Sequence, residues 1–326
     1  MQLVTMQLLL CMICTTMTAA ESGGSKLSGS RLSGGATIGA DGTVAPVMPF
    51  VRSNGELVED VMRPIENTLN VDGRTIALRP LHDELQLTYV HGLLSDDEVD
   101  DLVRLATLRD GFARSPLKQQ GTGSDATGGA QRNSSSCPML WPLVYASRIE
   151  EVKKVGGERA ERLIEELSLV SRLTSRVAEL FTQTGMELTE QHIEPLQLVR
   201  YVATEVFTPH HDYHEPDAQG HFPSSVQGEQ RVFTVLFFGA TLPADAGGET
   251  HFPELDIAVS PRKGDALIWA NVDGEGEPNP RSLHEGRPPA DGYTKVAVNC
   301  WIANKQFELG QGMDRAVRGK GSGGDA

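Results

Sequence analysis

A run of short apolar segments in the second half of the chain limits the fold more than any other feature. The segments are rich in branched and aromatic residues and are separated by clusters of Gly, Pro and Asp, a pattern typical of β-strands. They lie at Gln197 to Tyr201, Val232 to Phe238, Ala266 to Ala270 and Val296 to Ile302. Because the predicted helices precede these strands, we expect an α+β fold, with a small antiparallel barrel or jelly roll and packed N-terminal helices.

Two helices and one further strand are expected ahead of these segments. Alternating apolar residues from 85 to 89 predict a strand. Ser95 to Glu98 form a capping box, in which the two outer residues each bond the other's backbone amide, so a helix should begin there and run to about Thr107. A longer amphipathic helix is predicted from Glu158 to Thr182, where apolar residues recur at three- and four-residue steps.

Composition divides the chain into four parts. Residues 1–20 have no charged side chain and contain an apolar run followed by small residues, which predicts a cleavable signal peptide; because no basic residue precedes the run, an uncleaved anchor is the alternative. Residues 21–83 are predicted to be a low-complexity linker and N-terminal extension. One folded domain is expected at 84–308, followed by a disordered tail at 309–326.

Charge and cysteine content exclude two classes of function. The chain has 44 acidic and 29 basic residues and a net charge of −15, which opposes binding to phosphates, so we expect no nucleic-acid partner. Only Cys137 and Cys300 follow the predicted signal peptide. They are too few for a Cys-rich zinc site, and they permit one disulfide without requiring it.

His210 and Asp212 are candidate metal ligands. Residues two apart on an extended backbone point to the same face, so these side chains face together while His211 points away. His284, just before the last predicted strand, is the best candidate for a third ligand. Two His and one carboxylate on one face of an iron ion leave three positions open, as in the non-heme Fe(II) oxygenases.

A longer series of residues surrounds these candidates. The series is Arg200-Tyr201, Phe207, His210-His211-Asp212, Gln230-Arg231, Gly247-Gly248-Glu249-Thr250, Phe252-Pro253, Lys263-Gly264-Asp265, His284, Lys295 and Trp301. In residue type, order and spacing it resembles the catalytic domain of the prolyl 4-hydroxylases, which are Fe(II)- and 2-oxoglutarate-dependent dioxygenases. The resemblance covers about residues 85–305. It implies a double-stranded β-helix core of the jelly-roll or cupin type, with packed N-terminal helices.

By this resemblance, the iron ligands and catalytic residues are His210, Asp212 and His284. Lys295 is implied to pair with the distal carboxylate of 2-oxoglutarate. The residue pattern supports this assignment, because a cation on a core strand needs an anion. The alternative is an ordinary strand-end lysine at the surface.

Four further residues are expected to bind the co-substrate or the substrate. Tyr201 and Thr250 occupy positions that hydrogen-bond the carboxylate of the co-substrate, and the alternative for each is a buried structural hydroxyl. Arg231 matches a position linked to the peptide substrate. Trp301 shares a strand face with Lys295, so if that face lines the barrel interior, Trp301 should lie close to the substrate. Arg231 also lies beside Glu229, so a surface ion pair is an equal explanation for it.

The resemblance implies hydroxylation of peptidyl proline to 4-hydroxyproline, the activity of a procollagen-proline 4-dioxygenase, with release of succinate and CO2. Fe(II), 2-oxoglutarate, O2 and ascorbate would be required, and the substrate would be a proline-rich or collagen-like polypeptide. We expect location in the secretory pathway (endoplasmic reticulum or Golgi lumen) or secretion, with membrane attachment only if the N-terminal segment is an uncleaved anchor. The alternatives are the same chemistry on lysine or another side chain, and a non-catalytic metal-containing module that binds peptides.

Three departures from the family pattern concern the peptide groove rather than the metal. Thr204 stands where a glycine is usual before the metal-binding strand. Ala303 stands where a histidine often follows the tryptophan. One extra residue separates His284 from Lys295, and we assign it to the connecting loop.

Overall fold

The computed structural model describes residues 67–115, 133–222, 224–243 and 245–308, together with the backbone of three short strands nearer the N-terminus. These three are β1 (Ala36–Ile38), β2 (Val44–Pro46) and β3 (Phe50–Val51). The predicted signal segment, most of the predicted linker and the predicted tail lie outside the described residues. Within the described part of the chain, no helix is long and apolar enough to cross a membrane.

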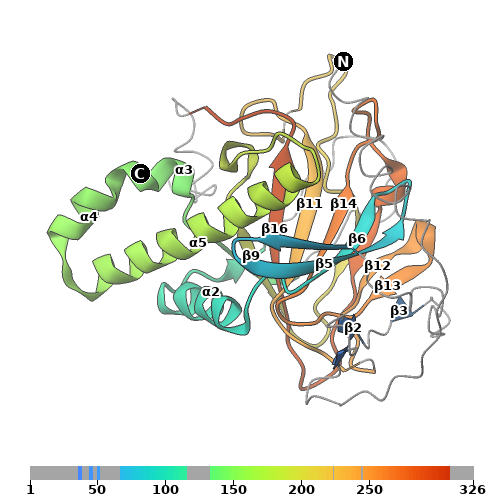
Figure 1. Cartoon of the computed structure of the whole chain (residues 1–326), viewed down its shortest axis with the longest axis horizontal. Helices are drawn as coiled ribbons and strands as arrows, with labels where there is room; N and C mark the ends of the chain where they lie inside the picture. Colours follow the sequence, from blue (N-terminus) through green and yellow to red (C-terminus); the bar gives the residue numbers. More distant parts are fainter. Residues whose placement is uncertain are drawn as a thin grey trace, which may run out of the picture.

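The largest unit is an antiparallel sheet of nine strands in the order β4-β5-β6-β14-β11-β16-β9-β8-β7. Its strands are β4 (Asn67–Val71), β5 (Arg74–His82), β6 (Leu87–His91), β7 (Ala113–Arg114), β8 (Ser135–Pro138), β9 (Gln197–Tyr201), β11 (Arg231–Phe238), β14 (Ala266–Ala270) and β16 (Lys295–Ala303). The four predicted apolar segments are β9, β11, β14 and β16, which lie side by side in the order β14-β11-β16-β9 (Figure 1).

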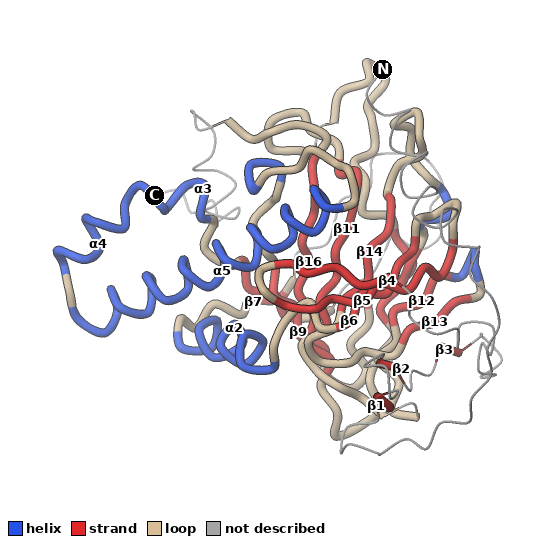
Figure 2. The backbone as a smooth tube through the Cα atoms, viewed as in Figure 1, coloured by secondary structure: helices blue, strands red, loops and turns tan. Residues whose placement is uncertain are grey.

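A second, smaller antiparallel sheet has the order β10-β15-β12-β13-β3. It contains β10 (Phe207–His210), β12 (Thr250–Phe252), β13 (Ile257–Val259) and β15 (His284–Gly286). Figure 2 shows β12 and β13 beside the large sheet. Three-residue strands are too short to show an alternation of apolar and polar residues, so the sequence pattern did not predict them.

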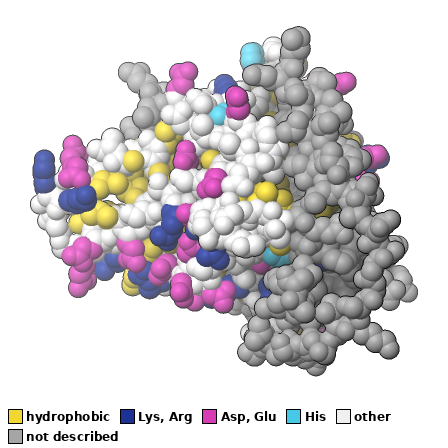
Figure 3. Space-filling view, in the orientation of Figure 1, with side chains coloured by type: hydrophobic (Ala, Val, Ile, Leu, Met, Phe, Trp, Pro, Cys, Tyr) yellow, Lys and Arg dark blue, Asp and Glu magenta, His cyan; other side chains and the backbone are white. Residues whose placement is uncertain are grey.

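The helices are α2 (Asp96–Leu108), α3 (Pro142–Tyr145), α4 (Ile149–Val155) and α5 (Gly157–Gln183), with short 3₁₀ turns at Ala146–Arg148, Glu190–His192, Pro253–Leu255 and Pro280–Ser282. The two predicted helices are confirmed as α2 and α5, and the capping box at Ser95 and Glu98 is present. The α4 helix and the first turns of α5 project from the body of the molecule (Figure 1). Acidic and basic side chains alternate over this projection, with apolar side chains between them (Figure 3).

Two hydrophobic cores lie on the two faces of the large sheet. On β16, Val298, Cys300 and Ile302 face the helices and pack in the core formed with α2 and α5. Ala297 of the same strand faces the small sheet, in a core that includes Trp269 and Phe252. The alternation along one strand therefore separates a helix-facing core from an inter-sheet core. This arrangement confirms the predicted α+β class, with a jelly-roll core and helices packed outside it.

The folded unit begins earlier than the predicted boundary at residue 84. The β4 and β5 strands precede that boundary, and β5 pairs with β6 of the large sheet. Val71 and Ile76 are fully buried in the helix-facing core. Asp72 and Gly73, which join the two strands, both have positive φ, as a tight hairpin turn requires. This Asp-Gly pair was the available sequence signal for the hairpin.

A buried arginine joins the β4-β5 hairpin to the helices α2 and α5. Arg176 of α5 donates two hydrogen bonds of 2.8 Å to the carboxylate of Glu98 on α2 and one of 2.9 Å to the Leu93 carbonyl. It also donates to Asp72 at 2.6 and 3.0 Å. Burial opposes ionisation of Glu98, but the bonds from Arg176 and from the Ser95 backbone outweigh it and lower the pKa of Glu98 to about 2.

Candidate metal centre and co-substrate site

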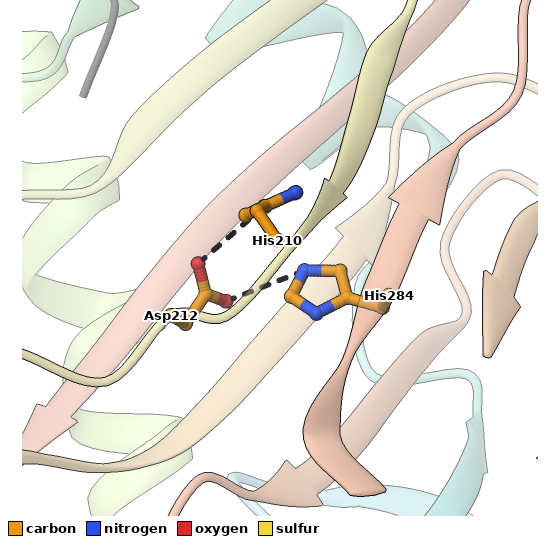
Figure 4. Close-up of side chains that lie close together, drawn as sticks. All are labelled: His210, Asp212 and His284. Atoms are coloured by element: carbon orange, nitrogen blue, oxygen red, sulfur yellow. Dashed lines mark ion pairs between the residues drawn. The ribbon is translucent and has the colours of Figure 1, made fainter. Parts of the chain in front are cut away.

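The three predicted metal ligands converge between the two sheets. His210 ends β10, Asp212 follows it by two residues, and His284 begins β15, which pairs with β10 so that His210 lies opposite His284. Asp212 Oδ1 lies 3.8 Å from His210 Nε2, and Asp212 Oδ2 lies 3.6 Å from His284 Nε2 (Figure 4). All three residues are buried, and one ligand atom of each lies within 4.8 Å of the others.

Backbone carbonyls orient both imidazole rings of this cluster. His210 Nδ1 lies 2.9 Å from the Thr208 carbonyl oxygen, and His284 Nδ1 lies 2.9 Å from the Ser282 carbonyl oxygen. A carbonyl only accepts hydrogen bonds, so each Nδ1 carries the proton in the neutral ring and each Nε2 presents its lone pair towards Asp212. Two nitrogen lone pairs and a carboxylate directed at one point fit a divalent cation such as Fe(II).

Aromatic side chains fix the same two rings. The Phe207 ring stacks on His210 with centroids 3.4 Å apart, and Trp269 contacts His284 edge-on at 4.7 Å. Phe252 lies 5.8 Å from His284 on the same side of the small sheet. Packing of this kind limits the rotamers of the ligands, as a preformed metal site requires.

Lys295 is buried, with 2% of its surface exposed, which excludes the alternative of a surface lysine. Its Nζ donates to the Glu249 carbonyl oxygen at 3.2 Å and to Thr250 Oγ1 at 3.4 Å, and it lies 5.6 Å from the centre of the Tyr201 ring. Within the described residues it forms no ion pair with a carboxylate. Burial therefore lowers the pKa of Lys295 to about 8, although Glu249 and Glu285 act in the opposite direction.

The lysine and the three ligands share one face of β15. His284 and Gly286 are two residues apart on this strand, so they face the same side. A Cβ atom added to Gly286 would lie 3.6 Å from Lys295 Nζ and 3.9 Å from Tyr201 Cζ. Gly286 therefore lies beside Lys295 and Tyr201 and two residues along β15 from the metal ligand His284, an arrangement suited to a short dicarboxylate that reaches both the metal and the lysine.

The structure places the two predicted substrate residues in contact with each other. The Arg231 guanidinium carbon lies 3.7 Å from the centre of the Trp301 ring. Arg231 also forms a bidentate ion pair with Glu194, at 2.6 and 2.7 Å, and donates to the Asp212 carbonyl oxygen at 3.4 Å. The ion pair expected beside Glu229 is thus made with Glu194 instead, a partner far in sequence from Arg231 that no local pattern indicated.

Two of the departures from the family pattern have structural consequences. Thr204 has φ of +71°, in the left-handed region that favours glycine, which agrees with the usual glycine at this position. Ala303 is buried against Trp141 and Phe307, whose rings meet edge-to-face at 5.1 Å. The small side chain at Ala303 therefore leaves room for this aromatic pair.

Residues 196–303 match the family model described as the 2OG-Fe(II) oxygenase superfamily. Prolyl 4-hydroxylase subunit alpha-1 of Gallus gallus is 28% identical over 224 residues, which cover 68% of this chain and 36% of that protein. The human subunit alpha-1 is 32% identical over 148 residues, which cover 45% of this chain and 25% of that protein. A putative prolyl 4-hydroxylase of Acanthamoeba polyphaga mimivirus is 32% identical over 115 residues, covering 35% of this chain and 46% of that protein.

Solved structures of prolyl hydroxylases are also similar to this chain. The viral collagen prolyl hydroxylase of Paramecium Bursaria Chlorella virus-1, in its 2OG complex, aligns with a TM-score of 0.45 and 21% identity, over 67% of this chain and 95% of that chain. The resemblance predicted from the sequence is confirmed by the family match and the curated relatives. The matched part of this chain spans only about a third, 36%, of the length of the Gallus gallus relative.

Proposed function

We propose that this chain, whose residues 196–303 form a 2OG-Fe(II) oxygenase domain, hydroxylates peptidyl proline to 4-hydroxyproline with release of succinate and CO2. One observation carries the proposal. A buried cluster of two histidines and an aspartate lies on the same side of β15 as a buried lysine that has no carboxylate partner among the described residues. The cluster fits Fe(II), and the lysine fits the distal carboxylate of 2-oxoglutarate.

The side chains of the site have separate tasks in this reaction. His210, Asp212 and His284 would hold Fe(II), which when bound supplies the activation of O2 and the oxidative decarboxylation of 2-oxoglutarate. The ammonium of Lys295 would bind the distal carboxylate, and the Thr250 hydroxyl, 3.4 Å from it, offers a further hydrogen bond. The surrounding aromatic rings exclude water from the centre.

The Arg231 and Trp301 pair supports a peptide substrate of low charge. Nε and Nη2 of Arg231 already donate to the Glu194 carboxylate, so Arg231 is not a free cation for an acidic substrate. Its flat face lies against the Trp301 ring, so the pair presents a rigid surface next to Asp212. A proline-rich or collagen-like segment, whose ring and amide groups are neutral, matches such a surface.

Two parts of the proposal have other support. Ascorbate as the reductant that keeps iron in the Fe(II) state is what the motif resemblance to prolyl 4-hydroxylases implies. A location in the secretory pathway is supported by the apolar, uncharged composition of residues 1–20.

The test is succinate release by the purified full chain supplied with Fe(II), ascorbate, 2-oxoglutarate and a panel of proline-rich peptides, combined with mass spectrometry of the peptides. We expect peptide-dependent succinate and the mass gain of one oxygen atom on proline. His210→Ala should abolish both, because it removes a metal ligand. His192→Ala is the matched control: the His192 side chain hydrogen-bonds Thr189 in a 3₁₀ turn and does not belong to the proposed site, so the substitution should leave the activity unchanged.

The other outcomes separate the alternatives. Succinate release with oxygen added to lysine or to another side chain would keep the oxygenase and discard proline as the substrate. A folded, metal-loaded chain that binds the peptides but neither binds nor consumes 2-oxoglutarate would be a non-catalytic peptide-binding module.

A further inference from the structure

A chain of hydrogen bonds leads from the metal centre into the large sheet. The Thr234 hydroxyl of β11 donates to Asp212 Oδ2 at 2.8 Å. Asn271, which follows β14, donates from Nδ2 to the same hydroxyl oxygen at 2.9 Å. Both Thr234 and Asn271 are fully buried. Neither residue belongs to the motifs that indicated the metal site.

The chemistry of the three groups permits only one direction for these bonds. An ionised carboxylate only accepts, so the single hydroxyl proton of Thr234 must point to Asp212. The hydroxyl oxygen then accepts from the second neighbour, so the amide of Asn271 must present its nitrogen and not its oxygen. The amide oxygen of Asn271 accordingly points elsewhere and has no hydrogen-bond partner among the described residues.

The backbone holds Asn271 in place for this contact. Its N–H donates to the Val232 carbonyl at 2.8 Å, and its carbonyl accepts from the Asn279 N–H at 3.0 Å. Thr234 is paired on both sides within the sheet, with Trp269 on β14 and Trp301 on β16. Both members of the chain are therefore attached to rigid strands, whereas Asp212 lies beyond the end of β10.

We propose that Asn271 is a positioning residue, which acts through the Thr234 hydroxyl to hold the Asp212 carboxylate in one orientation towards the metal. The inference rests on the proposed function, because it takes His210, Asp212 and His284 as metal ligands. With Oδ2 accepting from Thr234, the carboxylate is held where Oδ1 lies 3.8 Å from His210 Nε2 and Oδ2 lies 3.6 Å from His284 Nε2. A carboxylate held in one orientation would bind a metal ion more tightly than one free to rotate.

The experiment is a titration of the metal-free full chain with Co(II), which reports binding and ligand geometry without turnover. Thr234→Val removes the donor at constant volume, and we expect the Kd for Co(II) to rise about 10-fold, with a changed visible spectrum of the bound ion. Thr234→Ser keeps the hydroxyl and should restore both. Asn271→Leu should give part of the loss, because the hydroxyl then loses its orienting donor.

A double variant tests whether Asn271 acts through Thr234. In Thr234→Val combined with Asn271→Leu, we expect a Kd no weaker than in Thr234→Val alone, because the intermediate group is already absent. Thr88→Val is the control: Thr88 is a buried hydroxyl in the same sheet, it pairs with Ile268 on the helix-facing side, and its hydroxyl donates to the Gln86 carbonyl. It should leave the Kd unchanged.

Several results would overturn the inference. Thr234 would have no role in metal binding if Thr234→Val kept the wild-type affinity or if Thr234→Ser failed to restore it. Asn271 would not act through Thr234 if the losses in affinity multiplied in the double variant. Should Thr234→Val not fold, wild-type affinity and spectrum in Asn271→Leu would overturn it. If the wild-type chain itself bound no Co(II), the metal site and the proposed function would fail together, whereas normal binding in all variants would leave the proposed function intact.

Discussion

Arg176 and Lys295 are both buried cations with 2% of their surface exposed, yet their surroundings differ. Arg176 contacts two carboxylates and a carbonyl oxygen, and these hydrogen bonds raise its pKa in spite of burial. Lys295 contacts a carbonyl oxygen and a hydroxyl, and burial lowers its pKa to about 8. The first cation is compensated within the protein and serves the fold. The second forms no ion pair with a carboxylate among the described residues, which is a property expected of a binding site.

The largest effect is expected where the compensated cation is removed. Arg176→Met leaves Glu98 buried without its main partner, so we expect the free energy of unfolding to fall by about 3 kcal/mol in urea denaturation. Arg172→Met is the control, because Arg172 lies 3.2 Å from Glu98 but is half exposed, and its loss should be below about 1 kcal/mol. Equal losses of unfolding free energy in the two variants would show that the buried ion pair with Arg176 stabilises the fold no more than the half-exposed contact with Arg172.

The same network predicts sensitivity to acid. The pKa of Glu98 is lowered in the folded state from 4.5 to about 2. Its stabilising contribution is therefore fully present above about pH 4.5 and is lost as the pH falls towards 2. The difference in unfolding free energy between wild type and Glu98→Gln, measured in urea at a series of pH values, should be about 3 kcal/mol at neutral pH and should shrink below pH 4.5. A constant difference down to pH 2 would contradict the assignment.

The opposite pattern is expected for Lys295. Lys295→Met should weaken 2-oxoglutarate binding by about 100-fold, because a charge-assisted hydrogen bond is lost. The free energy of unfolding of the ligand-free chain should stay the same or rise, since a buried cation without an anion is removed. Calorimetry and urea denaturation measure the two effects. Lys263→Met is the control: Lys263 pairs with the exposed Asp100 outside the proposed site, so its loss should leave 2-oxoglutarate binding unchanged.

The lowered pKa also predicts how binding depends on pH. Below about pH 8 the Lys295 ammonium is charged and 2-oxoglutarate affinity should be constant with respect to this group. Above about pH 8 binding requires uptake of a proton, so the Kd should rise by up to about 10-fold per pH unit. In Lys295→Arg the cation persists at all these pH values, so any binding that this variant retains should lack the rise. A rise of the same size in Lys295→Arg would assign it to another group.

The smallest expected effect concerns the backbone before the metal-binding strand. Thr204 holds a left-handed conformation that a β-branched residue adopts only with strain. Thr204→Gly should therefore raise the free energy of unfolding by about 1 kcal/mol in urea denaturation. Thr208→Gly, at a residue of β10 in extended conformation, should have the opposite sign because glycine weakens a strand. A destabilised Thr204→Gly variant would show that the threonine side chain contributes contacts that exceed the strain.

Sequence periodicity predicted the elements that have many residues on one face. The α5 helix and the central strands β11, β14 and β16 were predicted to within one or two residues, because each repeats its apolar pattern over several positions. The strands of the small sheet have two to four residues and no comparable repeat. The capping box at Ser95 was predicted correctly because both of its hydrogen bonds are local.

The identities of the candidate site residues came from the sequence, and their arrangement came from the fold. His210 and Asp212 are neighbours on one backbone, so their common direction followed from strand geometry. The contact between Arg231 and Glu194, and the chain from Asn271 through Thr234 to Asp212, depend on which strands lie side by side. Pairing between distant strands leaves no local trace in the sequence.

What the sequence determined by itself was the chemistry available: two histidines, an aspartate and a lysine in an order that resembles prolyl 4-hydroxylases, and the short apolar strands to carry them. Only the tertiary structure decided that Lys295 is buried and forms no ion pair within the described part of the chain, while Arg176 is buried with two carboxylates. The reason is that burial and ion pairing depend on contacts between residues far apart in the chain. The same charged side chain therefore stabilises the fold in one place and forms a candidate binding site in another.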